Sequence, residues 1–294
     1  MLRRQKIILA LLDSAAKPLS QTTFVKLVFL LKEETEVRDD ATFYGFVPYH
    51  YGPFSFALYR ELEALVRDSY VVKDDVGLRL DTAMTAETRR LVADLPGAAR
   101  TAVDHVTSRY GSKAQNSLLR DVYARYPWFA AKTERKDLLP ATLPPSPSAQ
   151  PAVYTIGYEG NSIDSFFDRV LRAGVRGIAD VRANPVSRKY GFARSSLSGI
   201  AQKLGINYRH YPELGIPSVH RAALNGFASY QRLLDRYERT MLPKQTVGVA
   251  ALADLVQSEA TTLLCVESDV RCCHRSRLAD AVATVSGLPV KHLE

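Results

Sequence analysis

Apolar residues recur at helical spacing through most of the first 130 residues. They predict helices over 2–12, 20–31 (capped near Ser20) and 55–68, with further helix over 85–126. Between the third helix and the later helical region, the segment YVVKDDVGLRL has two β-rich halves joined by Asp and Gly, which predicts a small hairpin. Three helices and a hairpin in this order are typical of a winged helix-turn-helix.

From residue 153 onwards, short apolar runs alternate with amphipathic stretches. Strands are predicted over 153–159, 177–182, 208–214, 261–267 and 289–293, and helices over 163–173, 196–204, 228–241, 249–258 and 274–285. This alternation predicts an α/β fold with a Rossmann-like parallel sheet covered on both faces. Such sheets bind ligands beyond the carboxyl ends of their strands.

The two patterns are separated by KTERKDLLPATLPPSPSAQPA, whose five prolines predict a semi-rigid linker. We therefore expect a mostly helical, winged-helix-like domain over 1–131, a proline-rich linker over 132–152 and a Rossmann-like domain over 153–294.

The composition is that of a globular protein, with 46% apolar and 24% charged residues. No apolar run approaches the roughly 18 residues of a membrane span. The run at 7–12 is closed by Asp13, so we expect a mature first helix there and no signal peptide. The three cysteines, an odd number within nine residues, are not a disulfide framework. They favour a reducing, cytoplasmic location.

The net charge is +8, and its distribution favours nucleic acid or a nucleotide as partner. Residues 181–212 contain no acid, whereas six basic side chains are interleaved there with aromatic ones. Arginine forks suit phosphate and aromatic rings suit bases. A solvated basic surface is the alternative reading.

In the first half, the words KLVFLL, YHYGPFS and LYRELEAL resemble the N-terminal domains of Panacea-type, antitoxin-like proteins over about 80 residues. The predicted third helix departs from a good DNA reader because its acids, Glu61, Glu63 and Asp68, outnumber Arg60 and Arg67. DNA binding and protein docking both remain open for this helix.

The first four predicted strands of the second half carry polar residues near their ends that a purely structural strand does not need. These are Tyr158 and Glu159, Asp180 and Arg182, Arg209 and His210, and Cys265 and Glu267, with Cys273, His274 and Arg275 at a helix start. A helix N-terminus with an added arginine suits a phosphate. The coincidence predicts a functional cleft at this edge.

The words TIGYEG, ADVRANPVSRKYGF, LLCVES and CCHRSRLA resemble the domain-of-unknown-function family numbered 488 across about 140 residues. The resemblance implies a Rossmann-like fold and a site drawn from the matching residues, but no settled reaction. The matching site residues are Tyr158, Glu159, Asp180, Arg182, Cys265, Glu267, Cys273, His274 and Arg275.

Two other interpretations, both based on the cysteines, are less well supported by the sequence. Cys265 and Arg271 have the C-x5-R spacing of a phosphate-wrapping thiol loop, but the loop lacks glycine and carries two acids. Cys265, Cys273 and His274, with Glu267, suit zinc by type, yet adjacent residues of one helix point apart. We therefore assign no metal, identify no cofactor, and interpret Cys265 as a core residue.

In the favoured interpretation, arginines hold a phosphate and carboxylates perform acid-base chemistry. The catalytic candidates are Glu159, Asp180 and Glu267, and the substrate-binding candidates are Tyr158, Arg182, Arg188, Arg209, Cys273, His274 and Arg275. Tyr158 would stack on a base. The expected partner is a nucleotide or nucleic acid, DNA in preference to RNA, with no membrane; a homodimer is compatible with the sequence.

The sequence thus predicts a nucleic-acid-binding hydrolase that cleaves an N-glycosidic or phosphodiester bond, as in DNA processing, repair or phage defence. The alternative is a DNA-binding regulator whose second domain senses a nucleotide without catalysis. Turnover would separate the two.

Overall fold

The computed structural model describes residues 1–221, 224 and 226–293. The chain divides into two compact units, Met1–Pro145 and Ser146–Glu294, which we describe separately. The division falls within the proline-rich segment. The N-terminal unit extends to at least Leu138, which is buried in its core, and Thr133 Oγ1 donates to His50 O there.

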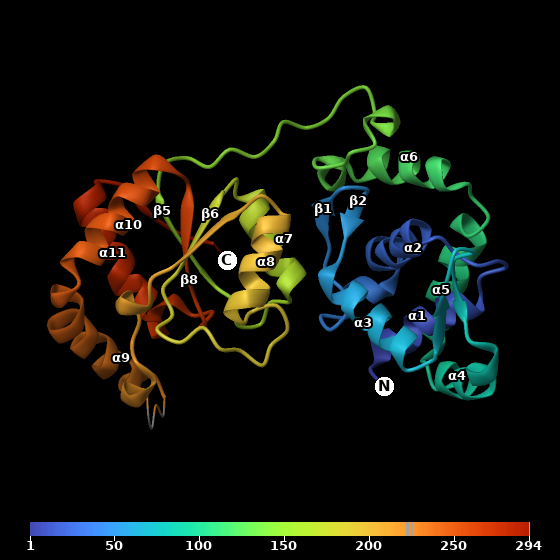
Figure 1. Cartoon of the computed structure of the whole chain (residues 1–294), viewed down its shortest axis with the longest axis horizontal. Coiled ribbons are helices and arrows are strands. Elements are labelled where there is room, and N and C mark those ends of the chain that lie inside the picture. Colours follow the sequence, from blue (N-terminus) through green and yellow to red (C-terminus); the bar gives the residue numbers. More distant parts are fainter. Residues whose placement is uncertain (222–223, 225, 294) are drawn as a thin grey trace. The chain divides into compact units, whose positions relative to one another are not determined.

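Six helices and two hairpins form the N-terminal unit (Figure 1). The helices are α1 (Arg3–Asp13), α2 (Gln21–Glu34), α3 (Phe56–Arg67), α4 (Thr85–Ala93), α5 (Gly97–Tyr110) and α6 (Gln115–Arg125), and the hairpins pair β1 (Val47–Tyr49) with β2 (Gly52–Phe54) and β3 (Val71–Lys73) with β4 (Leu78–Leu80). Helices α1, α2 and α3 and the β3–β4 hairpin are where the sequence predicts them. The winged-helix assignment itself stays a prediction.

Local capping explains where two of these helices begin. Ser20 Oγ accepts the Thr23 N–H ahead of α2, and Ser55 Oγ accepts the Leu58 N–H ahead of α3. On α3, Glu61 is bound by Arg4 of α1 and accepts the Tyr44 hydroxyl at 2.7 Å. That acid therefore acts within the unit and does not contribute a free charge to the outer face of the helix.

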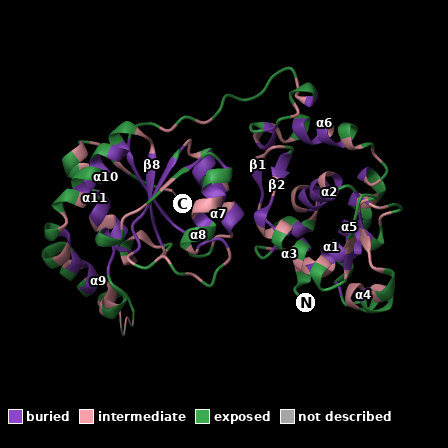
Figure 2. Cartoon of the chain, in the orientation of Figure 1, coloured by how far each residue is buried: buried purple, intermediate pink, exposed green. Residues whose placement is uncertain are grey.

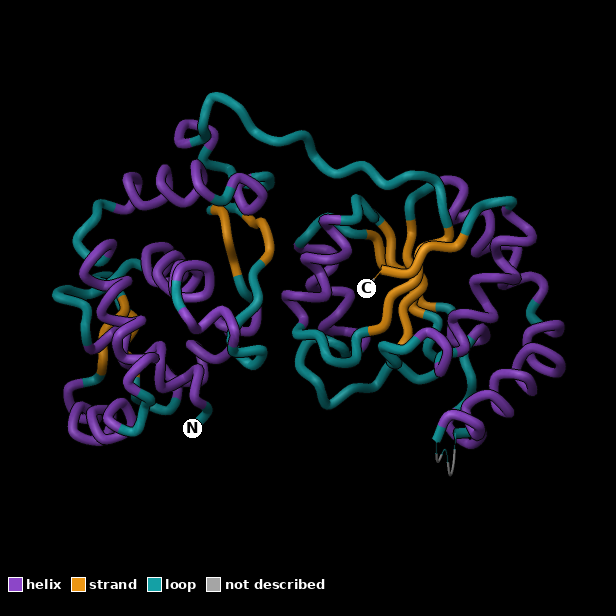
Figure 3. Tube along the Cα trace, turned by 180° about the vertical axis from the view of Figure 1, so that it is seen from behind, coloured by secondary structure: helices purple, strands orange, loops and turns teal. Residues whose placement is uncertain are grey.

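The C-terminal unit is a five-stranded parallel sheet between helices. Its elements are β5 (Val153–Gly157), α7 (Ile163–Arg172), β6 (Gly177–Asp180), α8 (Arg194–Lys203), β7 (Asn207–His210), α9 (Phe227–Arg236), α10 (Thr246–Ser258), β8 (Thr261–Cys265), α11 (His274–Ser286) and β9 (Val290–Leu293). Helices α7 and α8 lie on one face and α10 and α11 on the other (Figures 1 and 3). The predicted α/β alternation is confirmed, and the predicted helix over 228–241 becomes α9 followed by a π-helical turn, Tyr237–Met241.

The strand order is β7-β6-β8-β5-β9, with every pairing parallel. In the usual doubly wound order, the first two strands of the chain are neighbours. Here β8 lies between β5 and β6, and Cys265 is level with Gly157. The chemistry carried by β8 is therefore placed between the ends of β5 and β6.

The central strands β5, β6 and β8 are buried along their whole length (Figure 2). This fits their mostly apolar sequence, because helices cover both faces. Among the described residues, no helix combines the length and apolar character needed to cross a membrane.

Candidate functional site

The residues singled out at the strand ends gather at one edge of the sheet, because all its strands run in parallel. Tyr158 and Glu159 follow β5, Asp180 ends β6, and Cys265 ends β8. Their environments differ sharply, from fully buried to exposed. The structure therefore separates them into groups with different roles.

Asp180 and Arg182 form a buried, bidentate ion pair. Arg182 Nε and Nη2 donate to the two carboxylate oxygens at 2.8 and 2.6 Å, and Nη1 donates to Phe192 O. Tyr208 donates its hydroxyl to the same carboxylate at 2.7 Å. Burial opposes the charge on Arg182, but Asp180 outweighs it and the pKa of Arg182 is raised. With these donors and oxygens engaged internally, the geometry favours structural roles over catalysis and phosphate binding.

Tyr158 is also committed to the interior. Its ring is buried and stacks on Phe192, with ring centroids 4.2 Å apart, and the Arg182 guanidinium lies 5.3 Å from the ring centroid. The sequence predicted that Tyr158 would stack on a nucleic-acid base; in the structure its ring stacks on Phe192 instead. The Tyr158 ring packs the end of β5 against the loop after β6.

Glu159 is exposed, and one carboxylate oxygen accepts the Ser268 N–H at 3.1 Å and the Ser268 hydroxyl at 3.3 Å. Its backbone N–H donates to Val266 O. The carboxylate therefore lies beside the loop that follows β8.

Arg275 holds the same loop from within the unit. It is 2% exposed, and its two terminal nitrogens donate to the carbonyl oxygens of Glu267 and Ser268. Its Nε has no hydrogen-bond partner, and Arg275 forms no salt bridge with a described carboxylate. A Cβ at Gly157 would collide with Glu267 O, so only glycine permits this close approach of loop and strand.

Arg275 lines a pocket of about 650 Å³ at the ends of β5 and β9. The other lining residues are Gly157, Asn161, Arg169, Ser268, Asp269, Val270, Arg271, His292 and Leu293. Three arginines face one carboxylate, Asp269, which is already paired with Arg271. The pocket is therefore electropositive.

A second cluster lies between β8 and the start of α11. Cys265, Cys273 and His274 are buried, and their ligand atoms lie within 4.8 Å of one another. The Cys265 thiol donates to Glu267 Oε2 at 3.3 Å, and its Sγ lies 3.5 Å from His274 Nδ1. Burial raises the pKa of Cys273. Burial alone would also raise the pKa of Glu267, but hydrogen bonds from the two thiols and the charge of Arg221 lower it.

This cluster corrects the expectation that Cys273 and His274 point apart. Cys273 is the N-cap of α11 and has extended backbone angles, φ −127° and ψ 135°, whereas His274 is the first helical residue. The change of backbone conformation between them turns both side chains toward Cys265. The ligand types and their spacing therefore fit a metal, which the sequence analysis did not assign.

The remaining predicted residues lie elsewhere. Arg188 and Arg209 are exposed and do not line the pocket, and His210 Nε2 is 2.8 Å from Arg182 O. Sequence reasoning missed the pocket residues Asn161, Arg169 and His292, as well as Arg221 beside Glu267. Only Asn161 carried a signal, because it follows the glycine-flanked end of the first strand.

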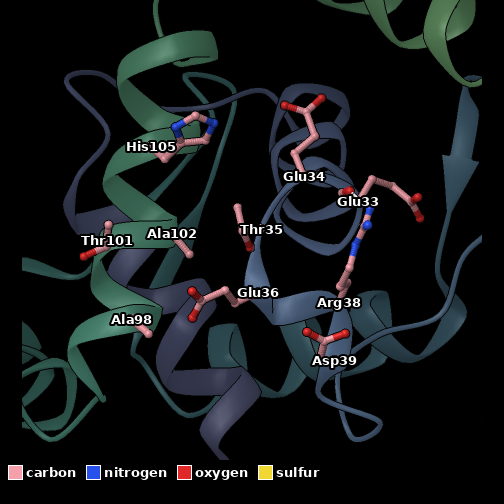
Figure 4. Close-up of a pocket in the computed structure, with 10 residues that line it drawn as sticks. All are labelled: Glu33, Glu34, Thr35, Glu36, Arg38, Asp39, Ala98, Thr101, Ala102 and His105. Carbon is pink, nitrogen blue, oxygen red and sulfur yellow. Dashed lines mark hydrogen bonds between the residues drawn. The ribbon is translucent and has the colours of Figure 1, made fainter.

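A pocket of about 600 Å³ in the N-terminal unit has the opposite charge. Figure 4 shows Glu33 and Glu34 at the end of α2 and His105 of α5 across from them. Glu36 and Asp39 add two more carboxylates against Arg38. A phosphate would be repelled here, so the C-terminal pocket is the better anion site.

Residues 162–282 match the protein family described as domain of unknown function DUF488. The match confirms the resemblance of the second half; the N-terminal resemblance stays a prediction. A comparison with curated proteins finds no match to the chain. Because the family's description names no reaction, the function has to be argued from the site.

Proposed function

We propose that the C-terminal unit binds the phosphate of a nucleotide or nucleic-acid strand in the Arg169–Arg271–Arg275 pocket and hydrolyses a bond in that ligand. The observation that carries the proposal is the charge of Arg275, which is buried and forms no salt bridge with a described carboxylate, Asp269 acting on it only electrostatically. A buried cation without a salt-bridge partner is costly. A bound anion would remove that cost.

The rest of the pocket suits such a ligand. Its volume falls within the range of small-ligand sites, about 300 to 1,000 Å³. Arg169 and Arg271 can approach phosphate oxygens from the exposed rim, while Asn161 and Ser268 offer hydrogen bonds. The net charge of +8 attracts polyanions over longer distances.

Glu159 is the acid-base group in this proposal. Asp180 is enclosed by Arg182 and Tyr208, and Glu267 belongs to the cysteine cluster, so Glu159 is the exposed carboxylate of the three candidates. Its partner Ser268 lines the pocket. Glu159 would take a proton from an attacking water, whose oxygen forms the new bond as the bond to the leaving group breaks. The leaving group would take its proton from solvent, which completes N-glycosidic or phosphodiester hydrolysis.

The engagement of two of the three carboxylates also favours the second candidate, a sensor that binds a nucleotide without turnover. In that case the N-terminal unit would contact DNA or a protein. Binding of the anion is common to both candidates, and only the chemistry of Glu159 separates them.

The test uses the full chain and fluorescein-labelled single-stranded DNA, with AMP and inorganic phosphate as competitors. Arg169→Ala should raise Kd about 10- to 100-fold, the equivalent of a lost charge-assisted contact. The matched control is Arg172→Ala on the same helix, whose guanidinium pairs with Asp168 outside the pocket. Equal weakening by both variants would contradict the pocket.

Chromatography of the reaction mixture tests the chemistry. The proposal expects product from the wild type, and Glu159→Gln should keep the wild-type Kd while forming none. Tight binding with no product from single- or double-stranded DNA, RNA or nucleotides, with and without divalent cations, would favour the sensor. Absence of binding to every one of these probes would contradict both.

A further inference from the structure

The cysteine cluster at the end of β8 brings together ligands from two separate stretches of chain. Cys265 ends the strand, while Cys273 and His274 begin α11. All three side chains are buried, with at most 2% exposed, and no other described groups of His, Cys, Asp or Glu come together in this way. The proposed anion site does not use them.

The distances agree with tetrahedral zinc. With Zn–S near 2.3 Å and Zn–N near 2.0 Å, tetrahedral geometry places a cysteine sulfur and a histidine nitrogen roughly 3.5 Å apart. Cys265 Sγ and His274 Nδ1 are 3.5 Å apart. The third ligand atom, Cys273 Sγ, lies within 4.8 Å of both, which a small inward movement would close.

The surroundings of His274 fix the imidazole in the orientation that a ligand needs. Its Nε2 is 3.0 Å from Val181 O, so an Nε2–H can donate to that carbonyl and leave the Nδ1 lone pair facing Cys265. Metal-bound histidines commonly donate their second ring nitrogen in this way. The edge of Tyr237 packs against the same ring, with centroids 5.4 Å apart.

Glu267 lies just outside this group of three but can supply a fourth ligand and the charge balance. Its Oε2 is 3.3 Å from Cys265 Sγ, and its Oε1 is 3.7 Å from Arg221 Nη1. Two thiolates and one carboxylate around a divalent cation leave one negative charge, which Arg221 neutralises. A buried metal centre of this composition therefore carries no uncompensated charge.

We propose that Cys265, Cys273, His274 and Glu267 form a zinc site that ties the end of β8 to the start of α11. Through Val181 the site also reaches the segment after β6. Because Glu267 and Ser268 follow in the same loop, the metal fixes the segment that borders the anion pocket. With four protein ligands the site is structural.

The first test is titration of the reduced, metal-free full chain with Co²⁺. We expect the visible bands of tetrahedral Co²⁺ together with a thiolate-to-metal charge-transfer band, saturating at one ion per chain and abolished by Zn²⁺. Protein purified from zinc-containing medium should carry the same amount of zinc by elemental analysis. A folded, reduced wild type without the charge-transfer band would overturn the proposal, as would a native Cys265–Cys273 disulfide.

The second test uses the neighbouring cysteine as a matched control. Cys273→Ser and Cys265→Ser should each lower zinc affinity by at least tenfold, whereas Cys272→Ser, a half-buried residue outside the cluster, should keep the wild-type affinity. Loss of the cobalt bands in Cys272→Ser to the same extent would contradict the assignment. The wild-type titration decides the matter if the buried variants do not fold.

Glu267→Gln tests the fourth ligand. An amide is a weaker zinc ligand than a carboxylate, so the affinity should fall by about tenfold or more and the visible cobalt bands should shift, while the charge-transfer band persists. Unchanged affinity and unchanged bands would remove Glu267 from the site. Zinc-depleted protein should still bind nucleotide, because the pocket arginines remain. This measurement therefore separates a failure of the zinc proposal from a failure of the anion pocket.

Discussion

Glu159 and Arg275 hold the same residue, Ser268, from its two sides. The Glu159 carboxylate accepts the Ser268 N–H and hydroxyl, and Arg275 Nη2 donates to the Ser268 carbonyl at 3.0 Å. The sequence predicted that both residues belong to a functional cleft at this edge of the sheet. In the structure they brace one loop, and only Arg275 lines the pocket.

Replacing Arg275 should therefore affect stability as well as ligand binding. Arg275→Lys keeps the charge but cannot donate to both the Glu267 and Ser268 carbonyls in the same planar geometry. We expect the free energy of unfolding to fall by about 2 to 4 kcal/mol, measured by urea denaturation. Arg271→Lys, at an exposed lining position, should stay within about 0.5 kcal/mol of the wild type. Equal stability of the two variants would show that the loop does not depend on Arg275.

Arg182→Met tests whether the buried pair with Asp180 is structural. Removing one partner leaves a buried carboxylate without its cation, so unfolding should become easier by about 3 to 5 kcal/mol. The double variant Asp180→Leu/Arg182→Met should lose less than the sum of the single losses, because no charge stays unpaired. Arg188→Met is the exposed control. A stable Arg182→Met that no longer binds nucleotide would return Arg182 to the phosphate site.

The elements of the C-terminal unit were predictable because strands that are buried on both faces have recognisably apolar sequences. Runs such as VYTIG and TTLLC are buried along their whole length and mostly apolar, and helix α7, which follows the first of them, is amphipathic. The parallel direction then placed the strand ends at one edge. The position of β8 between β5 and β6 was not predictable, since alternation alone does not fix strand order.

The roles of the polar residues were harder to predict, because sequence shows a side chain but not its partner. Arg182 looked like a phosphate ligand until Asp180 and Phe192 O were found to accept its hydrogen bonds. Arg169 and His292 enter the pocket from elements separated by more than a hundred residues. The β1–β2 hairpin was also missed, since prolines at Pro48 and Pro53 usually argue against strands.

Gly157 should tolerate no side chain. In Gly157→Ala the added Cβ would collide with the Glu267 carbonyl, so the loop must move away from β5. We expect a loss of more than about 3 kcal/mol in the free energy of unfolding, together with weaker nucleotide binding. Gly199→Ala on α8 meets no atom within 4 Å and should instead stabilise by about 0.5 to 1 kcal/mol. Thermal denaturation of the pair gives the comparison.

We expect Lys26 to make the stability of the N-terminal unit depend on pH. It lies on α2, is 3% exposed, and donates from Nζ to Pro53 O at 2.9 Å. Burial lowers its pKa from 10.5 to about 7. Between these values the unfolded chain holds a proton that the folded chain has released, so unfolding takes up a proton and becomes harder as pH rises.

The expected result is a free energy of unfolding that rises from about pH 7 to about pH 10.5, by at most about 1.4 kcal/mol per pH unit from this group. Lys26→Met should remove that part of the slope whatever its effect at pH 6, where the lysine is charged in both states. Lys32→Met on the same helix is the control, because Lys32 is only half-buried and its Nζ bonds to Arg38 O in an exposed environment, and it should keep the wild-type slope. Urea denaturation at several pH values measures this slope in the wild type and in both variants. An unchanged slope in Lys26→Met would mean that the ammonium group stays charged in the folded unit, stabilised by the Pro53 carbonyl alone.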